Sequence, residues 1–497
     1  YKRQAMEHAG RTGGLPFVGV GWYRTEFDVP QFQAGKRATI LFDGAMSHAN
    51  VYINGQKVGY WPYGYNSFHF DITKYLKPGE KNTLAVRLEN LPESSRWYPG
   101  AGLYRNVHLI ITEDAYIPVW GTYITTPSVN EKFAKVNVRT KVVLPEGADP
   151  AKYSVETSVW NPNKQKLTAV RTSLAQMKYN NNQAEQEFVI QAPSLWSPEM
   201  PALYSAETRL YEGDKLKDIY TTPFGIRSIE IIPDKGFFLN GKRTVFKGVC
   251  NHHDLGPLGA AVNDAAIRRQ IRILKDMGCN AIRTSHNMPA PELIRACDEM
   301  GMMIMAESFD EWNVAKCKNG YNLLFDEWAE KDLVNLLHNF RNNPSVVMWC
   351  IGNEVPNQWN EGDCKIAKWL QDICHREDPT RPVTQGMDAP DAVVNNNFAA
   401  VMDVAGFNYR PFKYKINYKK LPQRIVLGSE TASTVSSRGV YKFPVERKAM
   451  AKYDDHQASS YDVEHCGWSN LPEDDFIQHE DLPYCIGEFV WTGFDYL

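Results

Sequence analysis

From Gly236 onward the chain alternates short apolar runs with longer amphipathic segments, and this alternation constrains the fold more than any other feature. One amphipathic segment has a helix cap at Asn263 or Asp264, an apolar face beginning at Ile267, and a stop at Gly278. The apolar runs that indicate strands include residues 279–283, 302–306 and 346–351, the neighbourhoods of Val383, Val404 and Val426, and residues 484–491. Repeated strand–helix alternation predicts a parallel sheet with crossover helices. Eight such strands close naturally into a (β/α)₈ barrel.

Residues 1–230 have a different pattern, in which apolar and polar positions alternate between turn signals. Asn54-Gly55 is the strongest hairpin signal among them. The strand spacing after residue 116 is typical of a β-sandwich. We therefore expect an all-β domain over residues 1–115, a β-sandwich over 116–230 and the barrel over 231–497. A chain of 497 residues is long enough for about three such domains.

Composition excludes several classes of function. The net charge of −3 and pI near 6.5 give no electrostatic reason to expect a nucleic acid or membrane partner. No apolar run is long enough to span a bilayer. The nine scattered cysteines resemble neither a disulfide framework nor a zinc site. The chain begins at Tyr1, so the lack of a signal peptide carries no information about export.

Two glutamates occupy equivalent positions at the ends of predicted strands. Glu354 ends the motif Gly352-Asn353-Glu354 after the run 346–351, and Glu430 ends Gly428-Ser429-Glu430 after the run 425–427. Catalytic residues of such barrels lie at this end of the strands. Each glutamate alone is also compatible with an ordinary exposed loop residue. Together they supply the acid and the nucleophile that glycoside hydrolysis requires.

The two carboxyl groups need different surroundings for these roles. Aromatic side chains such as Trp349 would desolvate Glu354 and raise its pKa, as suits a general acid. A nucleophilic Glu430 must stay ionised, and Arg283 and Tyr409, at the ends of the second and sixth strands, are the expected partners. The alternative for Arg283 is a structural salt bridge.

Other polar residues follow the first three strands. His252 and His286, after the first and second strands, are candidates to hold sugar hydroxyls. The adjacent pair His252-His253 lacks the helical spacing of a zinc motif. The third strand is followed by Glu307, Asp310 and Glu311. One of them could be a ligand for a hard cation, but the oxygens are too few to commit to one, so we expect no required metal or cofactor and leave a divalent cation as the alternative.

Several motifs together resemble glycoside hydrolase family 2. They are the Asn-Gly-x-x-Val-Gly pattern at 54–59, the run 96–105, the run 280–287, Gly352-Asn353-Glu354, and Phe489-Val490-Trp491. They follow one another in the family's order over nearly the whole chain. The resemblance implies a jelly-roll sugar-binding domain, an immunoglobulin-like sandwich and a (β/α)₈ barrel, often with further β domains. We therefore expect the C-terminal part to be truncated, with the last barrel helix and any later domains beyond Leu497.

The resemblance also implies a role for each matching residue. Glu354 corresponds to the acid/base and Glu430 to the nucleophile, while Asn353 corresponds to the residue that contacts the sugar 2-hydroxyl. Arg283 and Tyr409 correspond to partners of the nucleophile. The positions that correspond to the sugar pocket are His252, His286 and Trp491. The loop around Arg96 and Trp97 is expected to lean over the barrel mouth.

Within this family the run 428–433 and the motif 437–439 look most like bacterial β-galactosidases. Trp312-Asn313 depart from the magnesium-dependent members, which again puts a metal site in doubt. The alternative is β-glucuronidase, which needs a cation for the sugar carboxylate. Few basic residues lie at predicted strand ends, whereas Asp310 and His286 are suited to the axial 4-hydroxyl of galactose.

The sequence therefore predicts a retaining exo-β-glycosidase that removes terminal β-D-galactose through a covalent glycosyl-enzyme. The alternative from another class is a non-catalytic carbohydrate-binding protein. We expect an oligosaccharide or glycoside as partner, with no nucleic acid and no membrane, and a homo-oligomer is left open. The expected location is the bacterial periplasm or cell envelope, with the cytoplasm as the alternative.

Overall fold

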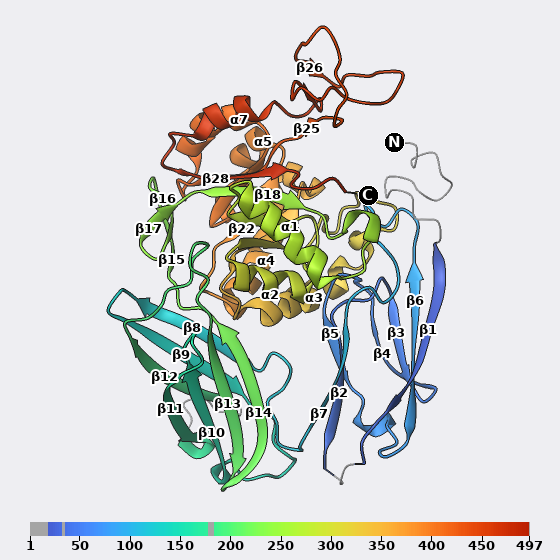
Figure 1. The fold of residues 1–497 in the computed structure, drawn as a ribbon, viewed down its shortest axis with the longest axis vertical. Helices are drawn as coiled ribbons and strands as arrows, with labels where there is room; N and C mark the ends of the chain where they lie inside the picture. The colour runs from blue at the N-terminus through green and yellow to red at the C-terminus, as the bar shows by residue number, and fades with distance from the viewer. Residues whose placement is uncertain (1–17, 32–34, 177–182, 497) are drawn as a thin grey trace.

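The computed structural model describes residues 18–31, 35–176 and 183–496. Its first part is a sandwich of two antiparallel sheets, ordered β1-β6-β3-β4 and β5-β2-β7 (Figure 1). The strands are β1 (Gly19–Asp28), β2 (Arg37–Phe42), β3 (Ala49–Ile53), β4 (Gln56–Trp61), β5 (Phe68–Asp71), β6 (Lys81–Asn90) and β7 (Val107–Thr112). Alternate residues of β6 point inward, so Leu84, Val86 and Leu88 are buried in the sandwich core. Asn54 and Gly55 both have positive φ in the predicted hairpin between β3 and β4.

The second part is another antiparallel sandwich, with sheets β11-β10-β13-β14 and β12-β9-β8. Its strands are β8 (Thr122–Val129), β9 (Phe133–Lys141), β10 (Tyr153–Trp160), β11 (Lys166–Ser173), β12 (Gln183–Gln191), β13 (Tyr204–Glu212) and β14 (Lys215–Phe224). Val136, Val159 and Phe188 from both sheets meet in its core. A short three-stranded sheet then leads to the third part, made of β15 (Ile229–Ile232), β16 (Gly236–Leu239) and β17 (Lys242–Thr244).

The third part is a closed barrel of eight parallel strands, which confirms the predicted architecture. The strands are β18 (Phe246–Asn251), β19 (Ala281–Thr284), β20 (Met303–Glu307), β21 (Val346–Asn353), β22 (Val383–Met387), β23 (Val404–Asn408), β24 (Val426–Ala432) and β28 (Cys485–Trp491). Met303, Met348 and Leu427 are among the side chains that fill one buried cluster of the barrel. Strands such as β19, β21 and β23 are buried along their length, which explains why barrel strands appear in the sequence as continuous apolar runs.

Helices surround the barrel strands. They are α1 (Asp264–Asp276), α2 (Pro291–Met300), α3 (Phe325–Phe340), α4 (Cys364–Glu377), α5 (Pro390–Asn395), α6 (Tyr414–Asn417) and α7 (Pro472–His479). In α1 the Asn263 side chain caps the first turn, and Ile267, Ile271 and Leu274 face the core, as predicted. No helix among the described residues is long and apolar enough to cross a membrane. All nine cysteines are free thiols.

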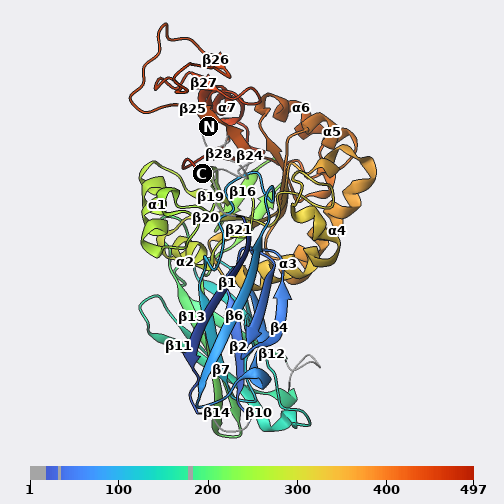
Figure 2. The same cartoon turned by 90° about the vertical axis from the view of Figure 1, so that its right-hand side faces the viewer.

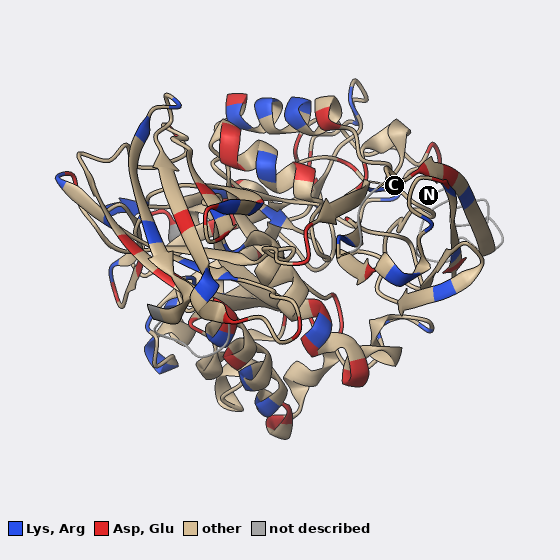
Figure 3. Cartoon of the chain, turned by 90° about the horizontal axis from the view of Figure 1, so that it is seen from below, with Lys and Arg blue, Asp and Glu red and all other residues tan. Residues whose placement is uncertain are grey.

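A long excursion, residues 433–471, separates β24 from α7. It contains three two-residue strands, β25 (Thr434–Val435), β26 (Lys448–Ala449) and β27 (Glu464–His465), which the sequence pattern did not predict. Figures 1 and 2 both show the excursion at the end of the molecule opposite the two sandwiches. Acidic and basic residues are interspersed over the elements visible in Figure 3, in keeping with the net charge of −3.

Buried polar contacts fix both sandwiches to the barrel. The Trp61 indole, the Asn66 amide and the Tyr321 hydroxyl donate to the carboxylate of Asp332 in α3, at 2.8, 2.6 and 2.6 Å. Arg227, after the second sandwich, donates to the carbonyl oxygens of residues 344 and 346. Because buried polar groups are costly unless hydrogen-bonded, these contacts help to determine how each sandwich meets the barrel.

Candidate active site

The barrel brings the two predicted glutamates together at the C-terminal end of its strands. Glu354 directly follows β21 with a positive φ of 42°, and its N–H donates to the Gly386 carbonyl at 2.7 Å. Glu430 lies within β24. One nitrogen, Nδ2 of Asn408 at the end of β23, donates to Glu354 Oε1 at 3.0 Å and to Glu430 Oε2 at 3.4 Å. These two oxygens therefore lie no farther apart than the sum of those distances.

Glu430 has the two partners expected from the sequence. The Tyr409 hydroxyl donates to Glu430 Oε1 at 2.6 Å, and Arg283 Nη1 donates to Glu430 Oε2 at 3.1 Å. The Arg283 side chain is fully buried and also donates to the Ser429 carbonyl at 2.8 Å. Arg283 and Tyr409 thus hold the Glu430 carboxyl group from two sides.

The pKa of Glu430 differs from the expectation that this carboxyl group stays ionised. Burial, followed by the nearby charge of Glu354, raises the pKa of Glu430 to about 8, while Arg283 and Tyr409 act in the opposite direction. The predicted desolvation of Glu354 by Trp349 was wrong, because the Trp349 indole packs in the outer core and donates to Asp378 at 3.0 Å. Glu354 is half-buried, whereas Glu430 is buried. Burial and the nearby charge of Glu354 thus favour the neutral form of the Glu430 carboxyl group.

Arg283 is shared between two carboxylates. Its Nε donates to Glu307 Oε2 at 2.5 Å, which is shorter than its contact with Glu430. The other Glu307 oxygen lies 2.9 Å from Nδ1 of His286. Burial raises the pKa of Glu307 to about 7 against the opposing charge of Arg283. Glu307 therefore orients both Arg283 and His286.

Asp310 is held by two cations, Arg96 from the loop expected at the barrel mouth and Lys316, which sequence reasoning did not assign to the site. Arg96, from the loop after β6, donates to both Asp310 oxygens at 2.9 and 2.6 Å, and Lys316 Nζ lies 2.7 Å away. Burial opposes ionisation of Asp310, but Arg96 and Lys316 outweigh it and hold the pKa of this carboxyl well below its usual range. The predicted approach of the Arg96 loop to the barrel mouth is confirmed.

Aromatic rings form the wall beside Glu307 and Asp310. Trp491, at the end of β28, stacks on His286 with ring centroids 5.1 Å apart and meets His252 edge-on at 5.2 Å. Trp97, from the first sandwich, lies 5.0 Å from the His252 ring and 5.7 Å from the His286 ring. Burial lowers the pKa of both histidines well below the usual value, so both are neutral at physiological pH. The His252 Nδ1 atom is buried without a hydrogen-bond partner.

Asn353 connects the two halves of this arrangement. Its Oδ1 accepts from Arg283 Nη2 at 2.7 Å and from Asn408 Nδ2 at 2.9 Å, and its Nδ2 donates to Asp310 Oδ1 at 3.1 Å. All predicted site residues therefore belong to one connected group. The residues that sequence reasoning missed, Asn408 and Lys316, carried no motif of their own.

The carboxylates considered as ligands for a cation already have protein partners. Glu307 pairs with Arg283, and Asp310 pairs with Arg96. Glu311 accepts from the N–H groups of residues 316, 317 and 322. Within the described ranges, no three His, Cys, Asp or Glu side chains are grouped so as to hold a metal ion.

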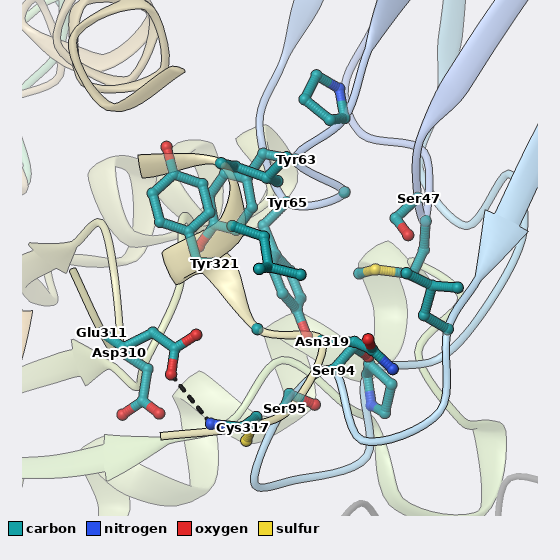
Figure 4. A pocket seen from close by; sticks show the side chains of 18 of the residues that line it. Ser47, Tyr63, Tyr65, Ser94, Ser95, Asp310, Glu311, Cys317, Asn319 and Tyr321 are labelled. Carbon is teal, nitrogen blue, oxygen red and sulfur yellow. Dashed lines mark hydrogen bonds between the residues drawn. The ribbon is translucent and has the colours of Figure 1, made fainter. Parts of the chain in front are cut away.

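A crevice adjoins the site where the first sandwich meets the barrel (Figure 4). Tyr63 and Tyr65 line it from the sandwich, and Tyr321, Asp310 and Glu311 line it from the barrel loops. Neither Glu354 nor Glu430 is part of its lining. The crevice thus adjoins the site through Asp310 and His286 and does not include the carboxylate pair in its lining.

Comparisons with known proteins place this geometry in a family. The sugar binding domain of glycosyl hydrolases family 2 matches residues 16–113, the family 2 model matches residues 116–227, and the family 2 TIM barrel domain matches residues 230–495.

Individual relatives agree with these matches. A β-galactosidase of Bacteroides ovatus is 38% identical over 99% of this chain and 63% of its own length. A β-glucuronidase of Bacteroides fragilis is 29% identical over 96% of this chain and 70% of its own length. The crystal structure of a β-glycosidase from Bacteroides vulgatus has a TM-score of 0.86 and 32% identity, covering 97% of this chain and 63% of that one.

The chain spans less than two thirds of the Bacteroides ovatus relative. Even so, three observations agree on the family. They are the three consecutive family models, the barrel with its two sandwiches, and the paired strand-end glutamates. The chain belongs to glycosyl hydrolases family 2.

Proposed function

We propose that this chain carries the catalytic site of a retaining exo-β-glycosidase that releases terminal β-D-galactose. The observation that carries the proposal is the shared contact of Asn408 with Glu354 and Glu430. Retaining enzymes have carboxyl groups about 5–5.5 Å apart, whereas inverting enzymes separate them by about 6.5–9.5 Å to admit a water. Two oxygens that contact the same nitrogen fit the shorter class.

The partners of the two glutamates support distinct roles. Glu430 contacts the positive Arg283 and the Tyr409 hydroxyl, both of which stabilise a carboxylate. Glu354 accepts a hydrogen bond from the neutral Asn408 amide, and we therefore assign the acid/base role to it.

Glu430 then attacks the anomeric carbon while Glu354 gives its proton to the leaving oxygen. This step forms the glycosyl-enzyme bond and breaks the bond to the leaving group. Water, deprotonated by Glu354, next displaces Glu430 from the sugar. Two displacements at the same carbon return the original β configuration.

The charges around the site favour a neutral sugar. Arg283 is paired with Glu307 and Glu430, and Arg96 is paired with Asp310. A sugar carboxylate would need a further cation, because burying an unpaired charge is strongly unfavourable. The similarity to the β-galactosidase of Bacteroides ovatus supports the same choice.

A second candidate, β-glucuronidase, has one specific observation in its favour. Arg96 and Lys316 share a single carboxylate, Asp310, so two cations face one anion beside the aromatic wall. The expectation of few basic residues at the strand ends did not cover these two, because Arg96 comes from the first sandwich and Lys316 from the loop after β20. The similarity to the β-glucuronidase of Bacteroides fragilis also supports this candidate.

Initial rates on nitrophenyl β-galactoside, β-glucuronide, β-mannoside and β-glucoside test the proposal, with Glu430→Gln as the inactive control. We expect the galactoside to have the highest kcat/KM. Preference for the glucuronide would transfer the proposal to the second candidate. No turnover of any glycoside by the wild-type chain, with sugar binding retained, would indicate a non-catalytic carbohydrate-binding protein.

A further inference from the structure

The half-buried Glu354 marks a side of the carboxylate pair that solvent reaches, whereas Glu430 is buried. Trp97, His252 and Trp491 close the site on the side of the first sandwich. The leaving oxygen must lie beside the acid, Glu354. The aglycone therefore leaves the site past Glu354 and the neighbouring loops that follow β23 and β24.

Trp468, from the excursion after β24, lies at this opening. Its backbone carbonyl accepts a hydrogen bond from Nη1 of Arg410, the residue after Tyr409. Burial raises the pKa of Tyr409, and the Trp468 side chain acts on it in the opposite direction, so the two side chains are neighbours; the Tyr409 hydroxyl is bonded to Glu430 at 2.6 Å. The Tyr409 side chain thus lies between Trp468 and the proposed nucleophile, Glu430.

The Trp468 side chain is nevertheless 51% exposed. A large aromatic ring left in water beside a polar centre forgoes the stabilisation that burial would give it. Exposed aromatic rings at the mouth of a site are well suited to bind the apolar face of a ligand, since they provide a large contact area with little conformational freedom to lose.

The backbone around Trp468 is fixed to the strand that carries Glu430. The Cys466 N–H and the Ser469 hydroxyl both donate to the Ser433 carbonyl, at 3.2 and 3.3 Å. Ser433 is only three residues beyond Glu430. The position of the ring relative to the carboxylates is therefore set by hydrogen bonds and not by a free loop.

We propose that Trp468 is the platform on which the aglycone stacks, and that it selects leaving groups with a flat apolar face. Two chemical sources provide such a face, the ring of an aryl glycoside and the hydrophobic face of a second pyranose. This inference rests on the proposed hydrolysis of β-galactosides and adds to it the class of leaving group. Trp468 contacts the leaving group and takes no part in proton transfer.

The test compares two galactosides whose leaving alcohols have similar acidity but different shapes. The leaving group of lactose is a pyranose ring, whereas the leaving group of trifluoroethyl β-galactoside contains no ring. In Trp468→Ala we expect kcat/KM for lactose to fall roughly five- to tenfold, the factor for loss of one stacked ring, with much less change for the trifluoroethyl compound. Trp468→Phe, which keeps a flat ring, should recover most of the lactose activity.

Nitrophenyl β-galactoside separates the two sources of a flat face. A loss on both lactose and the nitrophenyl compound indicates a general platform, and a loss on lactose alone indicates a sugar-specific one; either supports the inference. Trp22→Ala is the matched control, because Trp22 is 60% exposed on β1 of the first sandwich.

Equal losses on lactose and the trifluoroethyl compound would overturn the inference, because Trp468 would then act only by supporting Tyr409. Unchanged kinetics of Trp468→Ala on all three substrates would overturn it as well. Both outcomes leave the proposed hydrolysis intact, whereas failure of the wild-type chain on every galactoside overturns the proposed function itself.

Discussion

Replacing Asn408 with alanine removes a side chain that contacts both carboxyl groups. The Asn408 amide donates to Glu354, Glu430 and Asn353, and its oxygen accepts from the Ser429 hydroxyl at 2.7 Å. The alanine variant keeps the strand but leaves the two carboxyl groups without their common donor. We expect a loss of catalysis that exceeds the loss of folding stability.

The size of the loss follows from the contact distances. A hydrogen bond to a charged group contributes about 1.5–3 kcal/mol. The contact with Glu430 is long, at 3.4 Å, and shares its nitrogen with the contact to Glu354, so we count one full bond. A transition-state loss of about 2–3 kcal/mol corresponds to a decrease of roughly 30- to 150-fold in kcat/KM.

The assay is steady-state hydrolysis of nitrophenyl β-galactoside, with the unfolding midpoint measured in parallel. Asn82→Ala is the matched control, since Asn82 is equally buried and bonded to the backbone of residues 77 and 80 in the first sandwich. It should lower stability and leave kcat unchanged in the folded fraction. If Asn408→Ala retains kcat/KM within about threefold, less than one full hydrogen bond to the transition state was lost and the bridging role is refuted.

Three further predictions concern other parts of the network. Glu430→Gln should abolish turnover of every substrate, whereas Glu354→Gln should impair substrates with poor leaving groups far more than nitrophenyl glycosides; equal sensitivity to leaving-group acidity would contradict the assigned roles. Arg96→Ala leaves the buried Asp310 carboxylate without its bidentate partner and should reduce kcat/KM by about tenfold or more; unchanged kinetics would remove the Arg96 loop from the site. Burial raises the pKa of Asp332 to about 7, so the folded state binds its proton more tightly than the unfolded state. As pH rises from about 4 to about 7, the free energy of unfolding should therefore fall by roughly 2–4 kcal/mol. Urea titrations of Asp332→Asn should lack that part of the pH dependence. Parallel curves of unfolding free energy against pH for the wild-type chain and Asp332→Asn would refute this.

The sequence predicted those parts of the fold that repeat a local pattern. The helix from Asp264 has its cap, apolar face and stop encoded within a few residues, and its bounds agree with the structure. The strand expected at 279–283 begins two residues later, at Ala281, because apolar character does not mark where pairing begins. The excursion 433–471 escaped prediction, since its two-residue strands are too short to form a period.

The features of the site likewise divide into those that a local sequence pattern predicted and those that it did not. Glu354 and Glu430 were found because a strand-end carboxylate is visible in the sequence. The pairing of Arg96 with Asp310 was not found, because residues 214 positions apart meet only after the first sandwich has packed on the barrel. The burial of Glu430 and the half-burial of Glu354 likewise depend on the assembled neighbours. Neither motif therefore indicates which of the two carboxyl groups loses more contact with water.

The central claim is that Glu430 becomes covalently attached to the sugar. A 2-deoxy-2-fluoro-galactosyl fluoride slows both displacements but retains a good leaving group, so the glycosyl-enzyme accumulates when the nucleophile is present. Intact mass measurement should detect one added fluorogalactosyl group, and peptide mapping should locate it on Glu430, with no labelling of Glu430→Gln. Label on another residue, or turnover without a covalent adduct and with inverted product, would contradict the account.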